Sequence, residues 1–253
     1  WSPATRLTDA DTIHWSGAKQ PMTATLAVDG RRYRLLGLVP GVPALAQTSC
    51  EVRPTQTVCR FEDADVTAEL VFSTPALPDD LEVLARPVTY VTCRAAAKDG
   101  RPHDFAFDYA IDGRLATNDD QAKMETRRYR LGDLDVLRIG RAEQKPLSAS
   151  GDRIRCDWGY AYLVTGVRAA RGASFVTHAI LAYDDVESVR YLGRPLKAWW
   201  RRNGLSFDGL LVKAEADYPA LMRRMAAFDA RTLAEAARLG GPKYAALVGL
   251  SHR

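Results

Sequence analysis

Adjacent acidic residues are the first feature of this sequence that could do chemistry. Asp79 and Asp80 follow Pro78, and similar pairs occur at 119–120 and 184–185. Neighbouring residues of a strand point to opposite faces, so two adjacent carboxylates can act together only from a loop, which the proline favours. Such a pair could line a substrate site, although a solvated turn or a helix cap explains the same pattern.

Two pairs of a polar and an aromatic residue, His14-Trp15 and Asp157-Trp158, form the second group of candidates. Sites for sugars and amides use this combination, because the ring stacks on the ligand while the polar atom fixes its orientation. A tryptophan buried in the core of a sandwich explains the pattern as well.

Asp157 is the candidate for which we expect a charged partner. It lies between apolar residues of a predicted strand, where a lone charge is costly. We therefore predict that it pairs with an arginine, either Arg86 or Arg155.

Cys50 and Cys59 are spaced as a cross-strand pair. If Pro54-Thr55 is the tip of a two-residue hairpin, the cysteines lie directly opposite each other in a non-hydrogen-bonded pair. Their Cα atoms then fall near the ~5.5 Å that a disulfide requires. Pro-Thr is not a favoured tip, so two buried thiols remain the alternative.

Most known catalytic and cofactor signatures are absent, and the one literal match, S-x-x-K at 16–19, precedes Pro21 and β-prone residues where no helix is expected. The chain contains no G-x-S-x-G, H-E-x-x-H, G-x-G-x-x-G or P-loop motif, and no C-x-x-C. The acidic residues at 112–120 fit no calcium-loop spacing. We expect neither a metal nor a cofactor.

Short β-prone runs separated by turn dipeptides dominate the chain from about residue 22 to 183. Asp29-Gly30, Asp99-Gly100 and Asp112-Gly113 supply the positive φ that tight hairpins need. The pattern predicts a mainly β protein built as a large antiparallel β-sandwich. The predicted strands cover residues 23–28, 32–38, 48–52, 57–61, 67–72, 88–95, 104–111, 123–130, 136–139, 158–164 and 174–183.

Helical spacing replaces this pattern after residue 183. A short helix is predicted at 196–202, then helices at 208–228 and 229–239, a stop at Gly240-Gly241, and a last helix at 243–253. The predicted organisation is a lead-in at 1–22, the sandwich at 23–185, a linker with a short helix at 186–208, and helices at 209–253. Because the last helix leaves an apolar face uncovered, we expect the chain to be cut within a helical domain.

Composition and charge argue against two classes of partner. The 253 residues contain 35 basic and 31 acidic side chains, mostly intermingled, for a net charge of +4. A nucleic-acid-binding protein would concentrate basic residues on one stripe, so we expect no nucleic acid. No apolar run of about 18 residues occurs, so we expect no membrane span.

Taken together, several segments of the chain resemble the secreted glutaminase family. They run in order from the first residue to the last, and include 1–3, 12–17, 54–57, 74–81, 86–91, 157–160, 182–185, 200–204 and 240–247.

The resemblance implies a supersandwich-like β-domain followed by a larger α/α-toroid, in a protein that is secreted or periplasmic. The family's characterised activity is the hydrolysis of L-glutamine to L-glutamate and ammonia, so glutamine or a related amide is the expected substrate of the intact protein. This chain would be its N-terminal part, with the helical domain as partner. The resemblance transfers no catalytic residue. An exported setting also favours a Cys50–Cys59 disulfide.

The candidates for a substrate rim or a domain interface are therefore side chains in or beside loops. They are His14, Trp15, Asp79, Asp80, Arg86, Asp157 and Trp158. Two alternatives remain: the sandwich half of a glycoside hydrolase with a toroidal catalytic domain, and a glycan-binding module.

Overall fold

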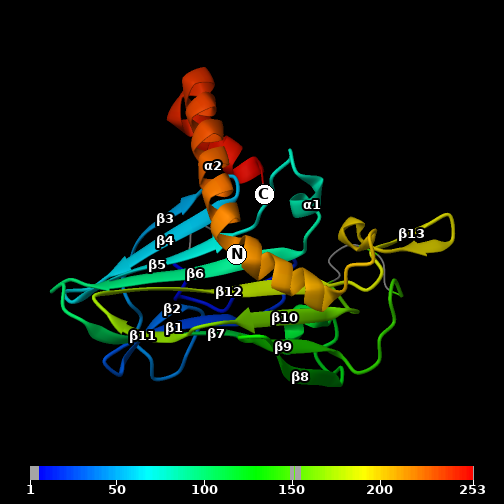
Figure 1. Cartoon of the computed structure of the whole chain (residues 1–253), viewed down its shortest axis with the longest axis horizontal. Coiled ribbons are helices and arrows are strands. Elements are labelled where there is room, and N and C mark those ends of the chain that lie inside the picture. The colour runs from blue at the N-terminus through cyan, green and yellow to red at the C-terminus, as the bar shows by residue number, and fades with distance from the viewer. Residues whose placement is uncertain (1–5, 149–150, 152–154, 253) are drawn as a thin grey trace.

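Two stacked antiparallel sheets and one long helix form the layers of the computed structural model (Figure 1), which describes residues 6–148, 151 and 155–252. The smaller sheet has four strands and the larger has eight, and helix α2 (Phe207–Ser251) lies on the outer face of the larger sheet. The predicted mainly β sandwich is confirmed.

All neighbouring strands in both sheets pair in the antiparallel sense. The small sheet runs β11 (Ala169–Gly172), β7 (His103–Ile111), β1 (Met22–Val28), β2 (Arg31–Leu36). The large sheet runs β3 (Gln47–Val52), β4 (Gln56–Glu62), β5 (Val66–Ser73), β6 (Val88–Ala97), β12 (Ser174–Asp184), β10 (Tyr160–Thr165), β9 (Leu134–Arg141), β8 (Met124–Leu131). Each predicted run is present as a strand.

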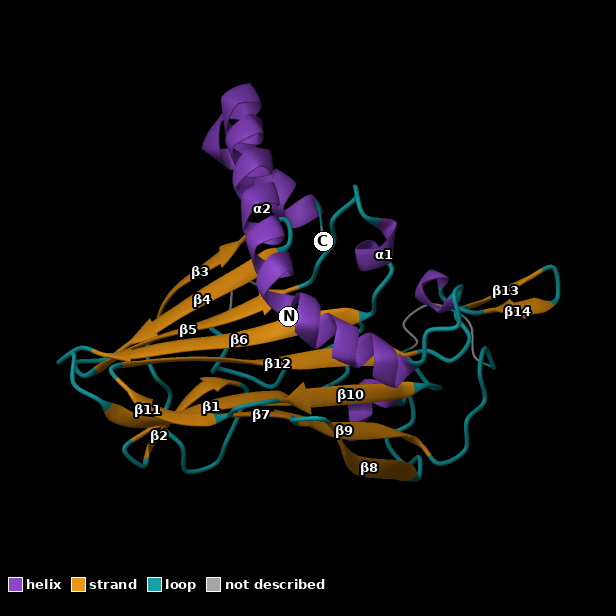
Figure 2. Ribbon diagram, in the orientation of Figure 1, coloured by secondary structure: helices purple, strands orange, loops and turns teal. Residues whose placement is uncertain are grey.

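Three short strands were not predicted. They are β11 and the separate hairpin of β13 (Val189–Tyr191) with β14 (Arg194–Leu196), which projects from one end of the molecule in Figure 2. β13 and β14 have three exposed residues each, too few for an alternation of apolar and polar residues to mark a strand.

The inner core lies between the two sheets. Leu26 and Leu35 of the small sheet and Leu70 and Val91 of the large sheet are completely buried there. The turn from β1 to β2 at Asp29-Gly30 has positive φ at both residues, 49° and 82°, as the Asp-Gly signal predicted. Alternation along these strands places every second side chain in this core.

A second core lies between the large sheet and α2. Leu210, Leu211 and Ala214 are completely buried, and they pack among outward-facing residues such as Tyr90 and Ile180. Tyr90 donates a hydrogen bond from its hydroxyl to the carbonyl oxygen of Ala214 at 2.8 Å. Because the helix covers their outer face, β6, β12 and β10 are buried on both sides.

The helical region differs from the prediction in two places. The helix predicted at 196–202 is wrong: β14 covers 194–196, and only a 3₁₀ turn, η2 (Trp199–Arg201), follows. No break separates 228 from 229, so residues 207–240 form one helix that includes Pro219. The predicted stop is confirmed, since Gly241 has φ 78° and a last helical stretch begins at Pro242.

We predict that Leu211→Ala lowers the free energy of unfolding by about 2–5 kcal/mol, the cost of truncating a buried leucine. Val212→Ala is the matched control, because Val212 follows it on the same helix and is 50% exposed. Urea titration of both variants measures the difference. Equal stabilities would mean that α2 does not share a core with the sheet in solution.

Candidate functional site

The longest connections leave the large sheet at one end, which we call the loop end. Antiparallel pairing brings the segments 53–55, 74–87, 142–148, 155–159 and 185–206 there. In Figure 1 the short helix α1 (Leu81–Leu84) and the hairpin β13–β14 mark this end. Most of the residues that the sequence singled out lie in these connections.

Asp79 and Asp80 occupy the loop before α1, as their spacing predicted. Asp80 is the N-cap of α1, accepts a hydrogen bond from the amide of Val83, and is 2.8 Å from the guanidinium of Arg224 on α2. The hydrogen bond from Arg224 lowers the pKa of the Asp80 carboxyl, against the opposing effect of burial. Asp79 is exposed and lies 4.0 Å from Arg224. Asp80 therefore anchors α1 to α2.

Arg86 forms a second link between the loop end and α2. Its side chain is only 5% exposed, and it donates to the Asp217 carboxylate at 2.8 Å, which also lies 3.5 Å from Lys213. Together with Asp80 and Arg224, these residues line a pocket of about 320 Å³. Since both ion pairs join a residue of the loop end to one of α2, this region is the interface between the loop end and the helix.

Asp157 is paired with an arginine, but not with the predicted one. Its carboxylate accepts from Arg141 at 2.7 Å, from the amide of Asn118 at 2.8 Å and from the hydroxyl of Thr117 at 3.2 Å. Burial tends to raise the pKa of Asp157, but these hydrogen bonds outweigh it, so the pKa lies below its usual value.

The predicted partners of Asp157 are engaged elsewhere. Arg86 binds Asp217, and Arg155 lies 3.2 Å from Asp120. Arg141 is the last residue of β9, which pairs with β10 through Gly140 and Tyr160. The register of these two strands, which sequence alone did not provide, is the signal that could have identified it.

The two aromatic candidates lie apart from the α1–α2 interface. Trp158 is half-buried and donates from its ring nitrogen to the carbonyl oxygen of Glu187 at 3.2 Å. Trp15 is 71% exposed, and His14 lies 2.9 Å from the hydroxyl of Ser16. Within the described residues no contact joins them to Asp79, Asp80 or Arg86, so these candidates do not form a single site.

A polar cluster beneath α2 escaped the sequence analysis. The ring of His178 stacks on Tyr218 with centroids 3.7 Å apart, and its Nε2 lies 2.9 Å from Glu215. The hydroxyls of Tyr218 and Thr92 are 2.8 Å apart. Since His178 and Thr92 come from β12 and β6, each polar group of the helix meets one from the sheet.

The β3–β4 hairpin has the predicted register. Cys50 pairs with Cys59 across a two-residue tip at Pro54-Thr55, and the two sulfurs lie 2.7 Å apart. The interaction with Cys50, together with burial, raises the pKa of Cys59. The bond itself stays a prediction.

The tip of this hairpin is attached to α2 by a buried carboxylate. Asp229 is 1% exposed, and its Oδ1 accepts from both the amide and the hydroxyl of Thr55 at 2.9 Å. The cysteine hairpin, α1 and Arg86 thus all contact the same helix.

Metal-ligand clusters and membrane-spanning helices are both absent from the residues that the structure describes. Among them, no three histidine, cysteine or acidic side chains converge as metal ligands would. None of the described helices combines the length and the apolar character needed to cross a bilayer.

Comparison with known proteins adds two similarities. Residues 55–179 match a family described as "Domain of unknown function (DUF5127)". The chain is also 27% identical over 152 residues to "Glutaminase A" of Aspergillus oryzae (strain ATCC 42149 / RIB 40). The chain is similar to both. The second match covers 60% of the chain and 22% of the relative's length. Both are consistent with a glutaminase A-like family.

Replacing Asp157 with alanine should lower the free energy of unfolding by about 2 kcal/mol, because Arg141 and the Asn118 amide lose their acceptor. Asp79→Ala and Asp119→Ala, at exposed positions, should change it by less than about 0.5 kcal/mol. Thermal melts of the three variants test the ranking. An Asp157→Ala protein as stable as the parent would contradict it.

The lowered pKa of Asp157 also predicts how stability depends on pH. A carboxyl whose pKa is lower in the folded state stabilises the protein above its unfolded pKa, about 3.9, and loses this effect as pH falls through the folded value. Asp157→Asn should therefore flatten the loss of stability below about pH 4. If the melting temperature of Asp157→Asn falls below about pH 4 as steeply as that of the parent protein, this prediction is wrong.

Folding under oxidising conditions should join Cys50 to Cys59, because the register already places the sulfurs side by side. Non-reducing peptide mapping detects the bridge, and Cys93, buried in β6, is the internal control for a thiol that stays reduced. Recovering Cys50 and Cys59 both as thiols would refute it.

Proposed function

We propose that this chain is the β-sandwich part of an exported glutaminase-like amidohydrolase, which converts L-glutamine and water to L-glutamate and ammonia. In this proposal the chain positions the catalytic part and forms the rim of its active site. The observation that carries it is the similarity to Glutaminase A over 152 residues.

The chemistry of the loop end supports a positioning role. Asp80 and Asp157 each accept hydrogen bonds from an arginine and from a backbone amide, and both have lowered pKa values. A general acid or base works best with a pKa near the operating pH, which such pairing moves further away. These two carboxylates are therefore suited to fixing the positions of the loops that they join, and not to proton transfer.

Amide hydrolysis also needs a nucleophile or an activated water, a base, and donors for the oxyanion. We assign these groups to a helical domain, within the part of a Glutaminase A-like protein that this match does not cover. The described residues of segments 74–87, 142–148 and 155–159 at the loop end would then close the rim of its site, and the Cys50–Cys59 register suits an exported protein.

The 253-residue chain alone should release no ammonia from L-glutamine above the buffer blank, because this proposal places the catalytic groups elsewhere. A coupled ammonia assay measures this, with intact Aspergillus oryzae Glutaminase A as the positive control. Turnover by the chain comparable with the control would overturn the positioning role.

The amidohydrolase itself is tested on the full-length protein that contains this sequence. Ammonia release from L-glutamine supports the proposal, and its absence in a folded full-length protein overturns it. The assay of the full-length protein tests the proposed activity, and the assay of the 253-residue chain tests whether the catalytic groups lie outside it.

A further inference from the structure

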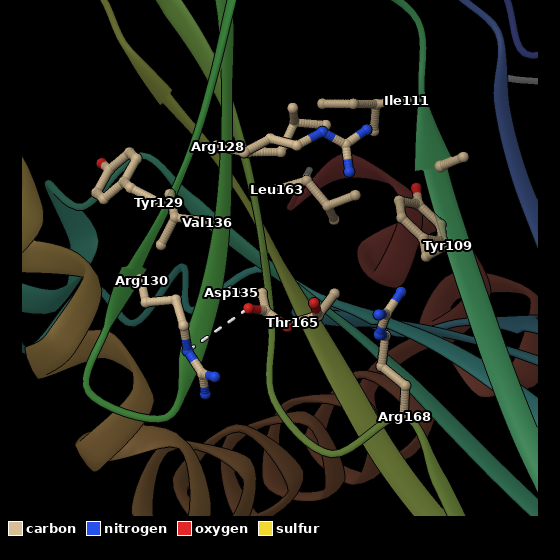
Figure 3. A pocket seen from close by; sticks show the side chains of 12 residues that line it. Tyr109, Ile111, Arg128, Tyr129, Arg130, Asp135, Val136, Leu163, Thr165 and Arg168 are labelled. Atoms are coloured by element: carbon tan, nitrogen blue, oxygen red, sulfur yellow. Dashed lines mark ion pairs between the residues drawn. The ribbon is translucent and has the colours of Figure 1, made fainter.

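The large sheet is wider than the small one, and a groove of about 570 Å³ lies where its inner face continues past the edge of the small sheet (Figure 3). Strands β8, β9 and β10 supply one wall, and the second half of β7 supplies the other. This face of the large sheet is opposite to the one that α2 covers, since Leu163 of β10 belongs to the inner core and Tyr162 to the outer.

Positive charge dominates the lining of the groove. Arg128, Arg130 and Arg168 contribute guanidinium groups, whereas Asp135 is the single acidic side chain among the lining residues that the structure describes. Arg130 lies 3.7 Å from Asp135, and both side chains are more than half exposed, so their attraction is weak. Among the described residues, no carboxylate is within ion-pair distance of Arg128. Arg168 lies 3.7 Å from the carboxylate of Asp108, and because both side chains are more than half exposed, this attraction is weak too.

The arginines surround an apolar surface. In Figure 3 Arg128 extends above Leu163 toward Ile111, while Arg168 lies below it, beside Thr165 and Tyr109. A ligand in the groove would therefore contact aliphatic and aromatic carbon while its charged groups face guanidinium ions. Arginine suits planar carboxylates because it can donate two parallel hydrogen bonds.

A free strand edge adds backbone donors to the same groove. On this side of β7, pairing with β11 ends at Ala106, and the amide of Phe107 donates to the carbonyl oxygen of Arg168. Backbone groups alternate sides along an antiparallel strand, so those of Tyr109 and Ile111 point the same way as those of Phe107. Within the described chain no strand pairs with them there.

We propose that this groove binds a small carboxylate-bearing ligand, of one or two acidic amino-acid or uronic-acid units. The guanidinium groups of Arg128 and Arg168 hold the carboxylate, the edge of β7 donates to it, and Leu163 contacts the carbon skeleton. This inference goes beyond the proposed function, because it concerns neither the loop end nor the interface with α2.

Isothermal titration calorimetry at low ionic strength tests the proposal with two acids and their neutral counterparts. The pairs are L-glutamate with L-glutamine, and digalacturonate with galactobiose. We expect at least one acid to bind at least about tenfold more tightly than its neutral counterpart, and to bind more weakly as salt is added. Binding of glutamate alone identifies an amino-acid site, and binding of digalacturonate alone identifies an acidic-saccharide site.

Three variants tie the binding to this groove. Arg128→Gln and Arg168→Gln should each weaken binding of that acid about tenfold or more, since each removes a charge-assisted contact. Asp135→Asn should tighten it by removing the opposing charge. Arg127→Gln is the matched control: it makes the same change one residue away, where the side chain lies over the ring of Tyr129, and should leave affinity unchanged.

The proposal is overturned if neither acid binds at concentrations on the order of 10 mM. It is also overturned if the neutral counterparts bind as tightly as the acids, or if Arg127→Gln weakens binding as much as Arg128→Gln does. Melting temperatures of the variants show that each remains folded, and the gain expected from Asp135→Asn cannot result from unfolding.

Discussion

Burial of one stripe of α2 against the outer face of the large sheet is the interaction on which the rest of this structure depends. Leu210, Leu211 and Ala214 are completely excluded from solvent there, and they cover apolar residues of β6, β10 and β12. The helix covers much of one face of this sheet, and the second sheet covers much of the other. Apolar area removed from water is the main favourable term in folding, so this contact largely determines whether the layers stay together.

Polar groups then determine where along the sheet the helix sits. Tyr90 anchors one turn of α2, Arg86 binds Asp217 further along, and Thr55 binds Asp229 beyond it. Each of these bonds joins a different strand or loop to the helix, so sliding the helix by one turn would leave several buried partners unsatisfied. The apolar stripe supplies the attraction, and the hydrogen bonds specify the position.

Local patterns made the strands, the cysteine register and the helix stop at Gly241 predictable. Asp-Gly turns, a two-residue tip and a glycine with positive φ are each determined within a few residues. The hairpin β13–β14 was missed because each of its strands has only three residues, too few for an alternating pattern to mark a strand. The partner of Asp157 was missed because Arg141 approaches it only through the register of β9 with β10.

The position of α2 after every strand of both sheets has a consequence for synthesis. A chain made from its N-terminus completes every strand of both sheets before the covering helix exists. During that interval the outer face of the nascent large sheet presents Tyr90, Val164 and Ile180 to other molecules, as an uncovered apolar sheet face that invites aggregation. A ribosome that pauses just before residue 207 prolongs this interval. The time between synthesis of the sandwich and synthesis of the helix therefore determines how long the nascent chain needs protection by chaperones.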